Sequence, residues 1–193
     1  MRHSDSAEEM WRDYLRSIGE DRATTAKVFA SWHFGDNEQS ASELAALVKA
    51  GRKGATASAY GVYENNQEPL PVAGDYSVIV SWTGEAQCII RTTAVEIVPF
   101  NEVTADFARC EGEGDRSLAY WRKVHWVYFA RELQAIGKRP RQKMPVVCET
   151  FEVVYGRCPD SRIPQKLLRG REPRGKVTAV QGRRAGGRRR RTG

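Results

Sequence analysis

Residues 76–98 have the sequence YSVIVSW-TGE-AQCIIRTTAVEIV, and the predicted fold is built around them. Two runs rich in β-branched and aromatic residues, 76–82 and 86–98, flank a short segment that contains Gly84. Such runs joined by three to five residues with a glycine are typical of a β-hairpin. The stretch therefore predicts two antiparallel strands in the middle of the chain.

Further elements are predicted on both sides of the hairpin. Residues 28–34 form an apolar run before the turn-prone Gly35, and residues 146–155 form a second β-rich run. Capping boxes at Ser6–Glu9 and Ser40–Glu43 predict two helices, which end near Gly19 and Gly51. Residues 117–133 predict a longer helix, because apolar side chains recur there at helical spacing. Strands with helices between them indicate one α+β domain over 1–155.

Composition limits the class of protein. The 193 residues suffice for one domain, and 40% hydrophobic with 28% charged residues is ordinary for a globular protein. No apolar run approaches the roughly 18 residues of a membrane helix, and the N-terminus lacks the apolar core of a signal peptide. We therefore expect a cytoplasmic protein that does not contact membranes.

The net charge of +7 is unevenly distributed along the chain. Residues 156–193 hold 13 Lys and Arg against two acidic residues, a net charge of +11. The other 18 basic and 22 acidic residues give the first 155 residues a charge of −4. The C-terminal segment is rich in Gly, Pro and Arg and predicts a disordered basic tail. It is either a non-specific contact for phosphate backbones or a solvated extension.

The cysteine and histidine positions predict neither disulfides nor a metal centre. Four cysteines stand far apart without a C-x-x-C pair, and three histidines show no H-E-x-x-H spacing. Free thiols in a reducing compartment are the simpler interpretation. We expect no metal and no cofactor.

The segment Gly51-Arg52-Lys53-Gly54-Ala55-Thr56 contains side chains that could bind or react with a ligand. It places a lysine and a hydroxyl three residues apart after a glycine that ends a helix. The pattern is not a P-loop, which needs G-x-x-x-x-G-K-[S/T] after a strand. On residues alone, Lys53 is either a surface charge that complements the helix dipole or part of a ligand site.

The same segment resembles the G-x-K-x-x-T signature of the ASCH domain family, relatives of the PUA RNA-binding β-barrels. Three further stretches are similar to the longer bacterial ASCH proteins. These stretches are IVPFNEV at 97–103, FARCEGEGDRSLAYWRKVH at 107–125 and MPVVCETFEVVY at 144–155. The resemblance spans residues 11–155 and excludes the basic tail.

The resemblance implies a small PUA-like β-barrel flanked by helices, with a cleft beside the signature. It also implies an RNA- or nucleoside-directed function. One group of short bacterial relatives hydrolyses the acetyl amide of N4-acetylcytidine with a lysine, a threonine and a glutamate, and others are ribonucleases. The resemblance assigns these catalytic roles to Lys53, Thr56 and Glu111. Glu113 and Asp115 compete with Glu111 within the same acidic turn, and Glu113 is expected to contact substrate. The turn residues Gly51 and Arg52 are expected to contact substrate.

Two function classes remain open from the sequence. A hydrolase requires burial to lower the pKa of Lys53, so that the free amine can act as nucleophile or base. Thr56 would then donate to the oxyanion or relay a proton, and Glu111 would be the acid or base. A non-catalytic RNA- or nucleotide-binding module needs Lys53 only as a phosphate contact. Trp32 and Phe34 either stack on a base or belong to the core.

Overall fold

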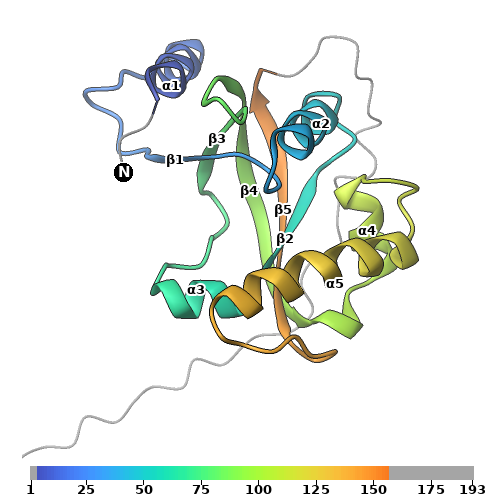
Figure 1. The fold of residues 1–193 in the computed structure, drawn as a ribbon. Helices are drawn as coiled ribbons and strands as arrows, with labels where there is room; N and C mark the ends of the chain where they lie inside the picture. Colours follow the sequence, from blue (N-terminus) through green and yellow to red (C-terminus); the bar gives the residue numbers. More distant parts are fainter. Residues whose placement is uncertain (1–3, 157–193) are drawn as a thin grey trace, which may run out of the picture. The chain divides into compact units, whose positions relative to one another are not determined.

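A mixed five-stranded β-sheet is the centre of the domain, in the strand order β1-β3-β4-β5-β2 (Figure 1). The computed structural model describes residues 4–156, so the predicted basic tail lies outside the described residues except for Gly156. The strands are β1 (Phe29–Trp32), β2 (Ala55–Ala59), β3 (Tyr76–Val80), β4 (Ala86–Pro99) and β5 (Pro145–Tyr155). The helices are α1 (Asp5–Ser17), α2 (Glu38–Lys49), α3 (Tyr60–Asn66), α4 (Ala105–Glu111) and α5 (Leu118–Ala135), with a 3-10 turn at Phe100–Glu102.

The predicted hairpin is confirmed as β3 and β4, which pair antiparallel with Ser77 opposite Ile90. Side chains on a strand alternate between the two faces of a sheet. One face of the hairpin packs against α2 through Ile79, Cys88 and Ile90. The other face packs against α1 through Val78, Val80 and Ile89. The hairpin is therefore apolar on both faces because a helix covers each one.

Helix α1 forms where the sequence predicts a helix, although it begins two residues earlier. The Ser4 hydroxyl accepts a hydrogen bond from the Ala7 amide and caps the first turn. Trp11 and Leu15 lie one turn apart and are fully buried. Each such side chain contributes about 1.5–3 kcal/mol through burial. The apolar stripe, rather than the short helix itself, holds α1 on the sheet.

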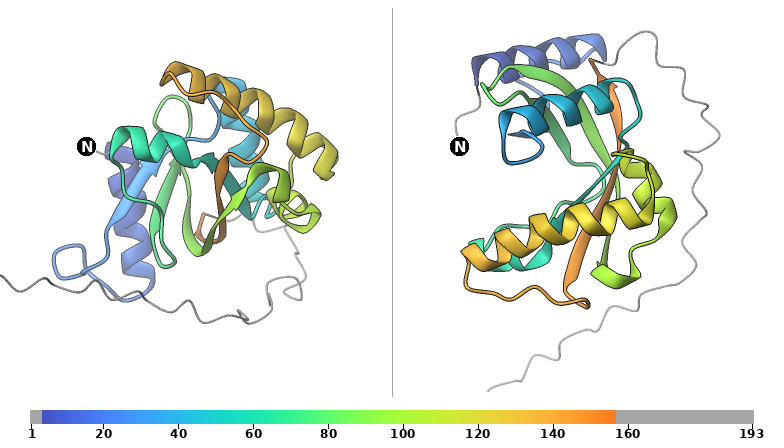
Figure 2. Two further views of the ribbon diagram at one scale, coloured as in Figure 1. Left: turned by 90° about the horizontal axis from the view of Figure 1, so that it is seen from below. Right: turned by 45° about the vertical axis from the view of Figure 1, so that its right-hand side comes forward.

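Helix α5 lies at the opposite end of the sheet from α1, as Figure 1 and the right-hand view of Figure 2 show. The Ser117 hydroxyl accepts from the Tyr120 amide and caps the helix. Phe129 and Trp121 are buried against Phe100 and against Val146 of β5. The long pairing of β4 with β5 continues to Pro99 opposite Pro145, so it joins the α1 and α5 ends of the sheet.

The expected closed β-barrel is wrong for the described strands, because the sheet remains open. Its edges are β1 and β2, which have four and five residues and do not pair with each other. Helix α2 connects these two strands and buries Ala45 and Val48 against the sheet. Trp32 of β1 and Thr56 of β2 both line a cavity. The region where a barrel would close is thus occupied by a helix and a cavity.

Glu149 on β5 is a buried acid, 8% exposed, whose Oε1 accepts a hydrogen bond from the Thr92 hydroxyl at 3.2 Å. Burial raises the pKa of Glu149 to about 7 from an ordinary 4.5, although the Thr92 hydrogen bond opposes this. Between pH 4.5 and about pH 7, Glu149 is deprotonated in the unfolded chain but keeps its proton in the folded chain. Stability is therefore lost as the pH rises through 7.

We expect Glu149→Gln to be more stable than the wild type at pH 8, by up to about 3 kcal/mol. The two proteins should be equally stable near pH 4, where the acid is protonated in both states. Urea unfolding at the two pH values measures the difference. The same stability difference at both pH values would contradict the assignment.

Within residues 4–156 no helix is long and apolar enough to cross a membrane. Cys88, Cys110 and Cys148 are free thiols in this part of the chain.

Candidate active site

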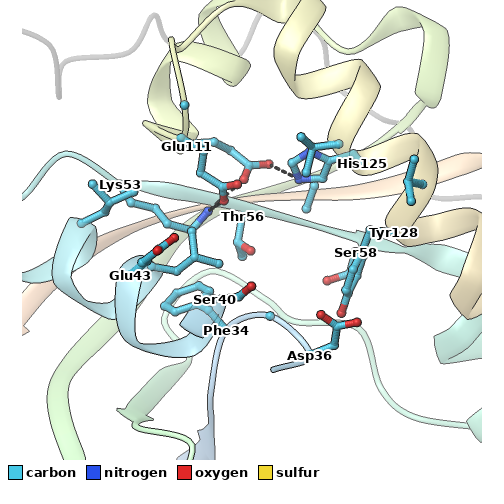
Figure 3. Close-up of a pocket in the computed structure, with 18 of the residues that line it drawn as sticks. Phe34, Asp36, Ser40, Glu43, Lys53, Thr56, Ser58, Glu111, His125 and Tyr128 are labelled. Carbon is cyan, nitrogen blue, oxygen red and sulfur yellow. Dashed lines mark hydrogen bonds and ion pairs between the residues drawn. The ribbon is translucent and has the colours of Figure 1, made fainter. Parts of the chain in front are cut away.

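A cavity of about 610 Å³ lies among the β1–α2 loop, α2, β2, the end of α4 and α5 (Figure 3). The structure places most of the sequence-predicted site residues in its lining. These residues are Trp32, Phe34, Lys53, Thr56, Glu111 and Glu113. Gly51 and Arg52 are not among the lining residues, and the Arg52 side chain is exposed. The volume lies in the range of sites that enclose small organic ligands.

The end of α2 directs Lys53 into the cavity. Gly51 has a φ of +68°, which favours glycine, and turns the chain out of the helix. The amides of Arg52 and Lys53 both donate to the Leu47 carbonyl, at 2.8 and 3.1 Å. Lys53 then enters the fold directly before β2 and is only 2% exposed. Gly51 therefore shapes the turn that positions the lysine.

The end of α4 directs Glu111 to the same place. The Thr104 hydroxyl accepts from the Phe107 amide at the start of this helix, and Glu111 is its last residue. Gly112 follows with a φ of +73°, and the Gly54 amide donates to the Cys110 carbonyl at 2.9 Å. A Cβ at Gly112 would lie 2.1 Å from the Arg52 carbonyl oxygen. The two turns can approach this closely only because Gly112 has no side chain.

We expect Gly112→Ala to destabilise the domain by more than about 2 kcal/mol, because the Cβ meets backbone and the φ is unfavourable for alanine. The shift that relieves the clash separates the Lys53 turn from the Glu111 helix end. Gly137, which also has a positive φ but open space around its Cβ, is the matched control. Thermal unfolding of the two alanine variants gives the comparison, and equal losses would show that the close approach is unimportant.

Lys53 is held between two carboxylates. Its Nζ lies 2.9 Å from Glu111 Oε2 and 2.6 Å from Glu113 Oε1. The Lys53 and Glu111 side chains are 1% exposed, whereas Glu113 is 16% exposed. Phe34 covers the ammonium, with the Nζ 5.3 Å from the ring centroid. Lys53, Glu111 and Glu113, all predicted site residues, thus form one buried ion cluster.

The ion cluster keeps the lysine charged. Burial alone lowers the pKa of Lys53, but the Glu111 and Glu113 carboxylates outweigh it and hold the pKa above its ordinary value. Burial likewise opposes ionisation of Glu111, and the Lys53 charge overcomes it, so the pKa of Glu111 lies well below its usual range. The expected lowering of the Lys53 pKa is therefore wrong for this arrangement. Burial makes a lysine amine lose its proton only where no carboxylate lies close enough to stabilise the ammonium.

Two residues of α5 complete the cluster. The Trp121 indole Nε1 donates to Glu111 Oε1 at 2.8 Å, and His125 Nε2 lies 3.4 Å from the same oxygen. His125 stacks on Trp121 with centroids 4.3 Å apart, and its Nδ1 lies 3.0 Å from the Trp121 carbonyl oxygen. Both residues lie in the helix predicted over 117–133, and neither was among the predicted site residues. Their spacing of four residues, which puts an indole and an imidazole on one helix face, was the available signal.

Thr56 lies beside the ion cluster at the lysine end of the cavity (Figure 3). Its hydroxyl has no hydrogen-bond partner among residues 4–156, although the side chain is half-buried. A half-buried hydroxyl without a partner beside a buried ion pair is available to a bound molecule.

Trp32 and Phe34, the aromatic pair singled out in the sequence, lie between the core and the cavity. Trp32 and Phe34 line the cavity and contact each other edge to face, with centroids 4.7 Å apart. Phe34 is 4% exposed and also packs against Phe151 in the core. Trp32 is half-buried, so its ring is the more accessible wall of the cavity. In the described part of the chain, no three His, Cys, Asp or Glu side chains gather as a metal site would require.

Comparisons with known proteins agree with this fold. The sequence profile of the ASCH domain matches residues 30–155. An ASCH domain from Lactobacillus crispatus JV V101 is 34% identical, with a TM-score of 0.74 over 79% of this chain and 96% of that chain. A protein from Enterococcus faecalis V583 is 36% identical, with a TM-score of 0.69 over 78% of this chain and 88% of that one. The search of curated proteins finds no match. The chain belongs to the ASCH domain family.

Proposed function

We propose that this protein is an amidohydrolase that removes an acyl group from the exocyclic amine of a free pyrimidine nucleoside, with N4-acetylcytidine as the representative substrate. The observation that carries the proposal is the fully buried Lys53, paired with two carboxylates next to the unpartnered Thr56 hydroxyl. The resemblance of these residues to the lysine, threonine and glutamate of the short ASCH amidohydrolases supports the same chemistry.

The charge of the cavity favours a neutral nucleoside over a phosphate-bearing ligand. Histidines aside, three cationic side chains line it against five carboxylates. The cations are Lys53, Lys123 and Arg131, and the carboxylates are Asp36, Glu43, Glu111, Glu113 and Glu132. Lys53 is already neutralised by its partners and has little attraction left for a phosphate. An acidic cavity repels RNA strands and nucleotides, and this argues against Lys53 as a phosphate contact.

In the proposed reaction Lys53 remains an ammonium and acts on the oxyanion. Water adds to the acyl carbon, and its proton passes to the Glu113 carboxylate, which is the more accessible of the two glutamates. With Glu113 protonated, Lys53 keeps only Glu111 as a charged partner, so its ammonium and the Thr56 hydroxyl stabilise the negative oxygen that forms. The bond from the acyl carbon to the amine nitrogen then breaks, and Glu113 returns the proton to the leaving nitrogen. The products are the carboxylic acid and the free nucleoside.

Glu111 has a positioning role in this scheme. Its Oε2 is bonded to Lys53, and its Oε1 accepts from Trp121 and lies near His125. Both oxygens are therefore engaged before any substrate binds. Because this carboxylate is buried, it fixes the lysine by charge as well as by geometry.

The test is to offer the purified protein N4-acetylcytidine, its 5′-monophosphate and unmodified single-stranded RNA, and to follow products by chromatography. We expect cytidine release from the nucleoside, a rate about tenfold lower for the monophosphate because of the acidic cavity, and intact RNA. A protein that leaves all three unchanged while it binds the RNA would be a binding module. Shortened RNA would make it a ribonuclease.

A further inference from the structure

The cavity extends beyond the ion cluster to a second polar end. Figure 3 shows Asp36, Ser58 and Tyr128 together across the cavity from Lys53 and Glu111. On β2, Ser58 follows two residues after Thr56, and both line the cavity. The strand thus contributes one hydroxyl-bearing residue to each end.

Helix α5 spans the same two ends. His125 lies at the ion cluster, and Tyr128 and Glu132 follow it at positions i+3 and i+7 on the same helix face. With a rise of 1.5 Å per residue, Glu132 lies about 10 Å along the helix from His125. This length accommodates a pyrimidine ring at the ion cluster and its sugar at the far end.

The β1–α2 loop spans the two ends as well, through a sharp turn. Phe34 covers Lys53, whereas Asp36 forms an ion pair with Arg131 of α5. Gly35 between them has a φ of +68°, and a Cβ there would lie 2.6 Å from the Ser40 Cβ. Position 35 therefore requires glycine. The turn directs the side chains on its two sides, Phe34 and Asp36, to opposite ends of the cavity.

The groups at the far end suit a hydroxyl-rich ligand. The Tyr128 hydroxyl interacts with the half-buried Glu132 carboxyl one turn along α5, and burial and this interaction together raise the pKa of Tyr128. The Arg131 guanidinium lies over the Tyr128 ring at 5.6 Å. Burial raises the pKa of Glu132, and the nearby charge of Asp36 adds to this. Carboxylates of Asp and Glu are the usual acceptors for ribose hydroxyls in nucleotide sites. The two carboxylates, Asp36 and Glu132, outnumber the one cation, Arg131, so the charge at this end disfavours a phosphate.

We infer that Asp36, Tyr128 and Glu132 form a subsite for the ribose hydroxyls of a nucleoside whose base lies against Lys53 and Thr56. The inference rests on the proposed function and assigns its substrate as a nucleoside rather than a free base. The sugar is recognised by hydrogen bonds from its hydroxyls to the two carboxylates, with Tyr128 holding Glu132 in place.

The experiment compares kcat/KM for N4-acetylcytidine and N4-acetyl-1-methylcytosine, in which a methyl group replaces the sugar. The wild type should prefer the nucleoside by about tenfold or more, since hydrogen bonds to charged acceptors are lost with the sugar. Asp36→Asn and Glu132→Gln should each reduce this preference severalfold, because kcat/KM falls for the nucleoside, which carries the hydroxyls that these carboxylates bind. Glu43→Gln removes a carboxylate elsewhere in the lining and should keep the preference.

Equal wild-type kcat/KM values for the two substrates would overturn the subsite and leave the hydrolase intact. If neither substrate is hydrolysed, the proposed function fails. The subsite is then tested on its own, by comparing the calorimetric affinities of the protein for cytidine and for 1-methylcytosine. Tighter binding of cytidine that Glu132→Gln abolishes would support it. Equal binding of the two, or a preference that Glu132→Gln and Asp36→Asn both retain, would overturn it.

Discussion

Replacing Lys53 with methionine is expected to reduce amide hydrolysis by at least about a thousandfold, and also to weaken the fold. Activity falls because the ammonium that stabilises the oxyanion is gone. The free energy of unfolding falls by about 3–5 kcal/mol, because Glu111 remains buried as a carboxylate without its lysine. The two effects have different causes and can be separated.

The double variant Lys53→Met, Glu111→Gln makes that separation. A glutamine at position 111 carries no charge, and its amide oxygen can still accept from the Trp121 indole. We expect the double variant to recover most of the lost stability and none of the turnover. Lys143→Met, at an exposed position, is the control and should change the unfolding free energy by less than about 0.5 kcal/mol. Urea unfolding and acetate release give the two readouts. Recovered turnover in the double variant would remove Lys53 from the chemistry.

The two glutamates are expected to differ in what their removal changes. Glu111→Gln leaves the lysine with one carboxylate partner, so both stability and turnover should fall, stability by about 2 kcal/mol or more. Glu113→Gln should lower kcat/KM by at least about a hundredfold while it changes stability by less than about 1 kcal/mol, because this side chain is partly exposed. Unfolding and steady-state kinetics on both variants give the comparison. If Glu113→Gln keeps its turnover and a folded Glu111→Gln has none, the acid and base role belongs to Glu111.

The sequence predicted the elements whose side chains alternate or recur regularly. The hairpin of β3 and β4, the closing strand β5 and the helices α1, α2 and α5 all lie where their apolar patterns place them. β2 has the sequence ATASA, in which small residues show no alternation of apolar and polar side chains. Its residues are buried by the elements packed around them, which the local sequence does not reveal. Helix α3 has no side-chain cap at Ala59, and the residue after its end, Gln67, has a positive φ without being glycine, so neither end carries a usual signal. These two elements could not be predicted from local pattern.

For the site, the signature identified the lysine and threonine, but not the electrostatics around them. Whether the Lys53 pKa rises or falls depends on distances of a few ångströms to Glu111 and Glu113, which lie 58 and 60 residues away in sequence. The far end of the cavity was missed for a related reason. Asp36 and Tyr128 belong to a turn and a helix that show no motif, and they meet only through the fold.

The central claim is that a charged, buried Lys53 promotes hydrolysis of an acyl amide. The most direct measurement is the release of acetate and cytidine from N4-acetylcytidine by the wild type and by Lys53→Arg, each shown to be folded. We expect the wild type to release the two products in equal amounts. Lys53→Arg should release neither, because the broader guanidinium cannot keep the geometry of the ammonium in so enclosed a place. A wild type that binds the nucleoside and releases nothing would contradict the role of Lys53 in hydrolysis, and so would a Lys53→Arg protein with wild-type turnover.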